Sequence, residues 1–196
     1  MVVLLRDRSD AMLRRVLGNA RGRGVTDTEL LEAAFERAMA PRFAKLDDDH
    51  DPRFLHPGRT ALILMDDVGF TDPRGLAAAI LAETESPELA SPNESQDDDS
   101  PDLRAALADA RGLPSMEQAE ELAEALLTAP EPLPLIALAE HLDQLRHLRL
   151  WAEADRLRAR GRIAARVLVP MADRVHPVMA RRLRWWVRRV AARTRD

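Results

Sequence analysis

The chain has 196 residues, of which 46% are hydrophobic, 32% charged and only 4% aromatic, and its net charge is −4. This length and balance predict one soluble domain with a substantial core, and the scarcity of aromatic residues favours packed helices over a β-sandwich. The absence of cysteine excludes a disulfide framework and thiolate metal ligands, and it agrees with a reducing compartment.

Short helices are predicted along the first 65 residues or so. The first, Ala11–Leu17, is expected to break at Gly18. Thr26 or Thr28 is expected to cap the second helix, which should end or kink near Pro41. The Asp-rich stretch 47–52, which also contains a histidine, is read as a solvated turn, and cation binding there is the alternative.

Two proline-started helices come next. His56 and Pro57 begin a helix that closes at Gly69, and Asp72 with Pro73 begins another that reaches Glu83. Residues 84–102 are rich in Ser, Pro and acidic residues, so they cannot bury enough apolar surface to offset the entropy of ordering. We therefore expect a mobile acidic loop inside a single domain that spans residues 1–196.

Further helices are predicted at 103–110 and 116–127, followed by a proline-rich connector and a helix from Leu135. One face of the Leu135 helix is apolar and should face the core. The other face carries polar residues at positions i, i+3, i+4 and i+7: Glu140, Asp143, Gln144 and His147. Such a face is usually solvated, and a metal-binding cluster is the alternative.

The C-terminal region is predicted to form a long helix from about residue 152 to 169, ended or kinked by Pro170, and a last helix from His176. Arginine dominates here, whereas residues 83–131 are mostly acidic. Of Trp185 and Trp186, one is expected in the core and the other partly exposed, with the arginines solvated or paired. Contact with nucleic acid or with an anionic membrane surface is the alternative.

No strand signal stands out, so the predicted fold class is all-α. No apolar run approaches the ~18 residues of a membrane span, and residues 1–5 are too short for a signal sequence. We expect a cytoplasmic protein without a membrane span.

Three segments, in this order, resemble the hydrolase domain of the RelA/SpoT family, a helical fold of the HD superfamily. They are Phe54–Pro57, Leu76–Leu81 and Leu138–Arg146, and Val169–Val175 adds a weaker likeness near the end. In that family the first segment contains a His-Pro ligand helix, the second precedes a His-Asp pair, and the third contains the last metal-binding Asp. The resemblance implies an HD-type helical bundle and an ancestral manganese-dependent hydrolysis of guanosine alarmones.

Residue by residue, the resemblance places metal ligands at His56, Glu83 and Glu140. The family's His-Asp pair falls on Ala82 and Glu83, so its central imidazole is missing, and Glu140 replaces the last Asp. One His and two Glu could still hold Mn²⁺. Because a carboxylate does not replace an imidazole in place, the resemblance indicates shared ancestry more strongly than shared activity.

Three functional hypotheses follow. The favoured one is a catalytically degenerate relative that uses its scaffold as a binding or regulatory module for a nucleotide or a protein partner. The second is a divergent metal-dependent nucleotide phosphohydrolase acting on alarmone-like substrates with Mn²⁺. The third is nucleic-acid contact through the Arg- and Trp-rich last helix. No catalytic residue beyond the ligands and no organic cofactor is predicted.

Overall fold

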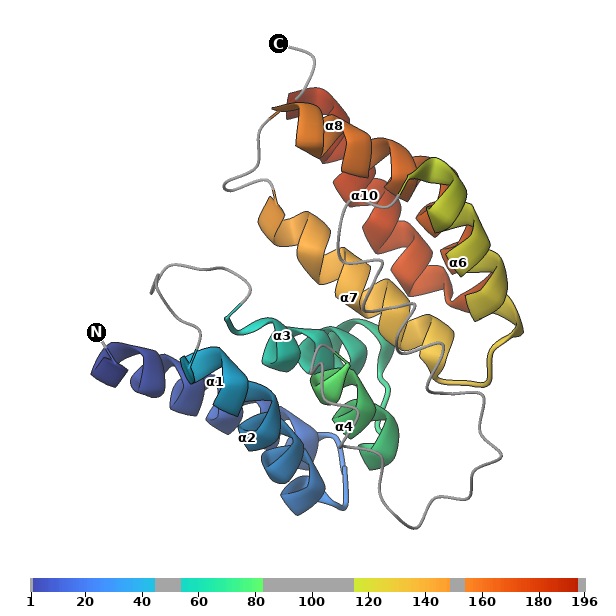
Figure 1. Ribbon diagram of the computed structural model, residues 1–196. Helices are drawn as coiled ribbons and strands as arrows, with labels where there is room; N and C mark the ends of the chain where they lie inside the picture. The colour runs from blue at the N-terminus through green and yellow to red at the C-terminus, as the bar shows by residue number, and fades with distance from the viewer. Residues whose placement is uncertain (1, 45–53, 83–114, 149–153, 194–196) are drawn as a thin grey trace.

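The structure is a computed structural model that describes residues 2–44, 54–82, 115–148 and 154–193 (Figure 1). All regular secondary structure in these ranges is helical, so the predicted all-α fold class is confirmed. The predicted acidic loop, the predicted helix at 103–110 and the Asp-rich stretch 47–52 lie outside the described residues.

The helices form two groups along the chain. The first comprises α1 (Val2–Gly22), α2 (Thr28–Ala44), α3 (His56–Ile63) and α4 (Pro73–Leu81). The second comprises α6 (Met116–Thr128), α7 (Leu133–Leu148), α8 (Ala154–Ile163), α9 (Val169–Val175) and α10 (Pro177–Arg193). Two π-helical segments extend neighbouring helices: η1 (Leu64–Val68) follows α3, and η3 (Ala164–Leu168) joins α8 to α9.

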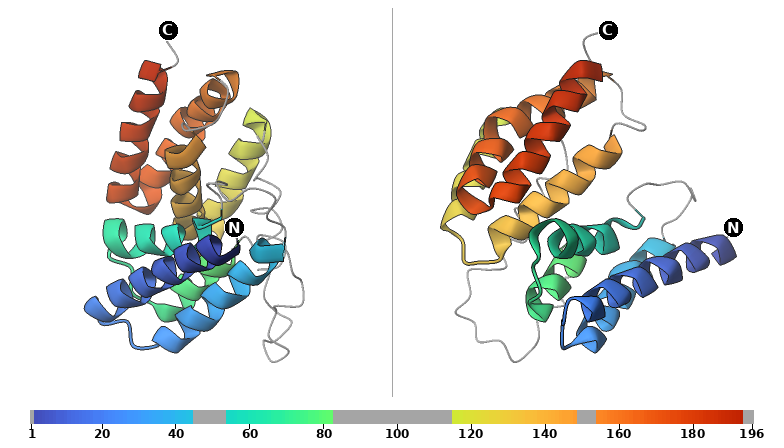
Figure 2. Two further views of the ribbon diagram at one scale, coloured as in Figure 1. Left: turned by 90° about the vertical axis from the view of Figure 1, so that its left-hand side faces the viewer. Right: turned by 180° about the vertical axis from the view of Figure 1, so that it is seen from behind.

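The two groups lie one above the other and meet where α3 packs against α7 (Figures 1 and 2). On its other sides α3 contacts α1, α2 and α4. All residues of α3 except Arg59 are therefore buried. A helix that touches both groups in this way determines how each is oriented against the other.

Asp67 of η1 forms a second link between the groups. Its carboxylate accepts hydrogen bonds from Arg146 of α7 and from Arg182 of α10, each at 2.8 Å. The Asp67 side chain is 9% exposed, so both contacts are partly shielded from water. The end of the α3–η1 element is thus tied to two helices of the second group.

Local signals determine where several helices begin or end, and those at Asp72, Pro73 and Gly69 are as predicted. Asp72 caps α4 by accepting a hydrogen bond from the backbone N–H of Gly75, with Pro73 in the first turn. Gly69, in the left-handed conformation at φ 75°, ends η1. Ser115 and Gln118 form a reciprocal capping box at the start of α6.

The prediction of a short first helix is wrong. α1 continues through Gly18 to Gly22, although a mid-helix glycine costs about 1 kcal/mol relative to alanine. Gly18 is exposed, while Val16, Leu17 and Ala20 around it are buried in the core. Burial of this apolar face outweighs the local propensity of one glycine.

The predicted kink at Pro170 takes the form of a π-helical segment. A proline inside a regular helix lacks an N–H donor and clashes with the carbonyl four residues earlier. Here the chain widens over η3, and Pro170 then occupies the first turn of α9, where its missing donor is tolerated. The proline connector before α7 is shorter than predicted, because Pro134 already lies in the helix.

We predict that Gly58→Ala destabilises the protein, because a methyl group there would lie 2.4 Å from Cγ of Met12 and 3.0 Å from Cε2 of Phe35. Overpacking of this kind lowers the free energy of unfolding by about 1–3 kcal/mol. The matched control is Gly18→Ala, where a methyl group meets nothing within 4 Å. We expect a gain of up to about 1 kcal/mol for this control. Urea denaturation measures both, and equal effects of the two substitutions would contradict the tight α1–α3 packing.

Candidate functional site

Two of the three predicted metal ligands lie together at the contact between α3 and α7. His56 is in the first turn of α3, Glu140 is in the middle of α7, and both side chains are buried. Nε2 of His56 lies 4.0 Å from Oε1 of Glu140. The third predicted ligand, Glu83, lies outside the described residues.

The polar face of α7 is buried at its centre, which corrects the expectation of a solvated face. Asp143, one turn after Glu140, is only 1% exposed. It is covered because α3 packs on this side of α7. Further along the same face, Gln144 and His147 remain partly accessible.

Asp143 is the centre of a buried ionic cluster. Nε of Arg59 lies 2.9 Å from Oδ1 of Asp143, and Nη2 of Arg59 lies 2.9 Å from its Oδ2. Nδ1 of His56 lies 2.6 Å from the same Oδ2. Arg59 and His56 are one turn apart on α3, so a single helix presents both groups to one carboxylate.

His147 completes the cluster from one turn further along α7. Its Nδ1 lies 2.8 Å from the backbone carbonyl of Asp143 and 3.3 Å from Oδ1. Because a carbonyl oxygen only accepts hydrogen bonds, Nδ1 of His147 is the donor.

The pKa of Asp143 reflects a balance between burial and these donors. Burial alone would raise it, but the hydrogen bonds from His147, His56 and Arg59, together with the charge of His56, hold the pKa well below its usual range. Asp143 is therefore ionised at neutral pH. An ionised carboxylate only accepts hydrogen bonds, so Nδ1 of His56 carries the proton.

A second buried polar contact joins α7 to α8. Arg160 of α8 is 6% exposed, and its Nη2 donates a 2.6 Å hydrogen bond to Oε1 of Gln144. Burial, together with the nearby charges of Arg160 and His56, lowers the pKa of His141 to about 3, although a hydrogen bond with Gln144 raises it. His141 is therefore neutral at physiological pH.

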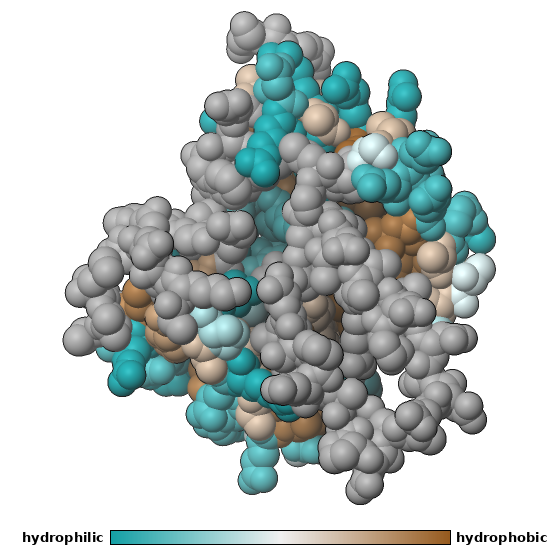
Figure 3. Space-filling view, in the orientation of Figure 1, coloured by the Kyte–Doolittle hydropathy of each residue, from teal (hydrophilic) through white to brown (hydrophobic). Residues whose placement is uncertain are grey.

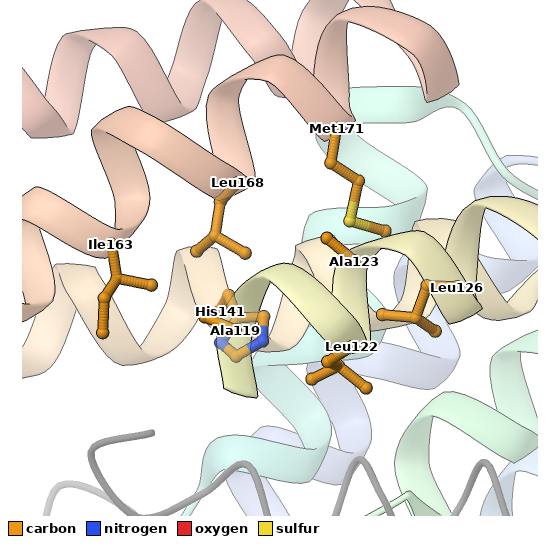
Figure 4. Close-up of a pocket in the computed structure, with 8 residues that line it drawn as sticks. All are labelled: Ala119, Leu122, Ala123, Leu126, His141, Ile163, Leu168 and Met171. Atoms are coloured by element: carbon orange, nitrogen blue, oxygen red, sulfur yellow. The ribbon is translucent and has the colours of Figure 1, made fainter. Parts of the chain in front are cut away.

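His141 borders a small apolar hollow between α6, α7 and the α8–α9 segment (Figure 4). Its other lining side chains are Ala119, Leu122, Ala123, Leu126, Ile163, Leu168 and Met171. In Figure 3, hydrophobic surface gathers beside the position of α6. With a neutral imidazole as its single polar lining group, the hollow offers little to orient a charged substrate.

The described residues do not complete the metal site that the resemblance implies. His56 and Glu140 supply two ligand groups, while catalytic metal sites usually have three protein ligands. In the part of the chain that the structure describes, no group of three or more His, Asp or Glu side chains could hold a metal ion. The nearest additional carboxylate, Asp143, already has Arg59 on both oxygens.

Sequence reasoning did not identify Arg59, the residue that most clearly distinguishes this cluster from a metal site. A signal for it existed. His56 and Arg59 are three residues apart on one predicted helix, and Glu140 and Asp143 are three apart on another. This spacing places each pair on one face of its helix, which is a partial signal, because it does not show that the two faces pack against each other.

Comparisons of the chain with models of protein families, with curated proteins and with solved structures found no match. None of the helices in the four described ranges combines the length and the apolar composition that crossing a membrane requires.

We predict that Arg59→Met lowers the free energy of unfolding by about 3 kcal/mol, because it leaves a buried carboxylate without its main counter-charge. The control is Arg158→Met, since Arg158 pairs with Asp155 on the surface, where both side chains are at least half exposed. An exposed pair of this kind contributes less than about 1 kcal/mol. Chemical denaturation compares the two variants, and similar small losses in both would contradict the role assigned to Arg59.

We also predict that acidification lowers the free energy of unfolding and that His141 causes part of this loss. The unfolded chain protonates this residue below about pH 6.5, whereas the folded protein protonates it only near pH 3. Acidification between these values therefore favours the unfolded state, by about 2 kcal/mol between pH 6.5 and 4.5. Urea titrations at several pH values should show this loss in the wild type and a correspondingly smaller loss in His141→Gln. Parallel pH profiles of the two proteins would contradict the prediction.

Proposed function

We propose that this chain is a catalytically silent relative of the HD-superfamily hydrolases, which keeps the helical scaffold and acts as a binding or regulatory module. The observation that carries the proposal is the pairing of Arg59 with both oxygens of Asp143, beside His56. A fixed guanidinium balances the buried negative charge in the region where the resembling family holds a metal ion.

Electrostatics supports this interpretation. A divalent cation at His56 and Glu140 would lie near the charge of Arg59, and like charges repel strongly in a poorly solvated site. Asp143 cannot readily exchange partners, because Arg59, His56 and His147 all stabilise its ionised form. The cluster is thus suited to holding α3 and α7 together without any bound ion.

The resemblance itself receives support from the placement of two residues. His56 and Glu140 are 84 positions apart in sequence, and the likeness to the RelA/SpoT hydrolase domain assigned both to one metal site. Their side chains lie 4.0 Å apart. Shared ancestry explains this proximity, and the substitution of the family's central histidine by Ala82 explains why the chemistry would be lost.

The same proximity favours a second candidate, a divergent metal-dependent nucleotide phosphohydrolase. His56 and Glu140 would then be joined by Glu83 as ligands of Mn²⁺, which supplies Lewis acidity and an activated water when bound. Under either hypothesis the partner is a nucleotide or a protein, and the absence of cysteine agrees with work in a reducing cytoplasm.

Metal content distinguishes the two candidates. We expect the purified protein, after dialysis against trace manganese, to contain far less than one metal ion per chain by elemental analysis. We also expect its melting temperature to be unchanged by Mn²⁺, because a ligand that binds only the folded state would raise it.

The informative variant is His56→Ala, with His176→Ala as the matched control, since His176 lies at the end of α9. Near-stoichiometric manganese or iron that is lost in His56→Ala but retained in His176→Ala would contradict the silent-module proposal. That result would support the phosphohydrolase and justify a screen of nucleotide substrates.

A further inference from the structure

Positive charge is concentrated in the last three helices. Residues 154–193 contain twelve arginines, two aspartates and no lysine or glutamate, a net charge of +10. Because the whole chain carries −4, all its other residues together carry −14. Every one of these twelve arginines is exposed except Arg160. The region therefore presents a strongly cationic surface on a protein whose overall charge is negative.

Many of these arginines are available for an external partner. The surface ion pairs that hold some of them are Arg158–Asp155, Arg182–Asp67 and Arg184–Asp173. Six others form no ion pair with any described residue: Arg156, Arg162, Arg166, Arg174, Arg181 and Arg188.

α10 divides cleanly into a core face and an outer face. The helical spacing of Met179, Leu183, Trp186, Val187 and Val190 predicts an apolar face, and all of them except the half-buried Val187 are buried in the core. On the outer face Trp185 is 47% exposed, which confirms that one tryptophan is in the core and the other is accessible. Figure 2 shows α10 at the outside of the second helix group.

Trp185 lies at the centre of an arginine-rich surface. Residues three and four positions away in a helix are its surface neighbours, and at Trp185 all four of these positions are arginine: Arg181, Arg182, Arg188 and Arg189. Cζ of Arg189 lies 5.2 Å from the centroid of the Trp185 ring. The buried Trp186 packs edge-on against the same ring, with centroids 4.7 Å apart, and supports it from below.

We propose that the outer face of α10 binds single-stranded nucleic acid. The exposed arginines would contact backbone phosphates, and Trp185 would stack on a base. Guanidinium groups match phosphate oxygens in a two-pronged geometry, and an aromatic ring within a cationic surface is the usual platform for unpaired bases. The proposal concerns a different surface from the buried α3–α7 cluster and does not depend on whether that cluster binds a metal.

A membrane surface is a poorer match. A helix that lies in a lipid interface inserts its apolar face among the acyl chains. The apolar face of α10 is instead used in the protein core, which leaves Trp185 as the one large apolar side chain on its outer face. Without insertion, charge attraction would hold an anionic lipid no more tightly than a nucleic acid. The exposed ring of Trp185 favours the nucleic acid, because it can stack on a base.

The first experiment measures binding of a fluorescein-labelled oligothymidine of about 20 nucleotides to the full chain by fluorescence anisotropy, at about 50 mM salt and upward. We expect saturable binding that weakens steeply as salt increases, because each phosphate contact releases counterions. The measurement is repeated with EDTA, which should leave the affinity unchanged. Equal binding with and without EDTA separates this proposal from any metal-dependent function of the buried cluster.

Four variants test the surface itself. Arg181→Gln/Arg188→Gln should weaken binding about tenfold and make the slope of log K against log salt shallower by about 1.4. Arg14→Gln/Arg15→Gln removes the same charge from exposed positions of α1 and should change the affinity less than about twofold. Trp185→Ala should weaken binding of the single strand about tenfold, while Trp185→Phe retains most of the affinity.

Several results would overturn the proposal. No binding at low salt would remove it, and so would equal losses in the α10 and α1 double variants. Undiminished binding by Trp185→Ala would show that no base stacks there. Vesicles of phosphatidylcholine and phosphatidylserine that capture the protein while oligothymidine fails to compete would assign the surface to lipid instead.

Discussion

A single buried carboxylate determines how the two halves of this molecule fit together. Asp143 lies where α7 meets α3, and without partners its burial would cost several kcal/mol. Arg59 and His56 supply those partners from one turn of α3. Apolar contacts between two helices tolerate sliding and rotation, but a two-pronged ion pair does not. The cluster therefore fixes the register of α3 on α7, and Asp67 reinforces that register through Arg146 and Arg182.

The parts of the fold that could be predicted from sequence are those set by neighbouring residues. Asp72 with Pro73 starts a helix, Gly69 ends one, and the apolar stripe of α10 faces the core, because each signal acts within a turn or two. The length of α1 was not predictable, since burial of Val16 and Ala20 against other helices outweighs Gly18.

The candidate site was predicted only in part, for a related reason. The proximity of His56 and Glu140 followed from a likeness to a known family, not from any local rule. Helical periodicity shows that Glu140, Asp143 and His147 share a face, but not whether another helix covers that face. Arg59 gains its role only once α3 lies against α7. The importance of Arg59 was hidden because Arg59 and its partner Asp143 are 84 positions apart in the chain.

The segregation of charge has a practical consequence for how this protein behaves in solution. A sequence pI of about 5.8 suggests that the protein passes through a cation exchanger at neutral pH. Molecules respond to the nearest charges, however, because salt screens the field beyond about 8–10 Å. The region 154–193, with its eleven exposed arginines, should then adhere to a negatively charged resin, while the acidic remainder of the chain adheres to a positive one. Its orientation on any charged surface would follow from where its charges lie. The net charge would predict neither this orientation nor which resin the protein binds.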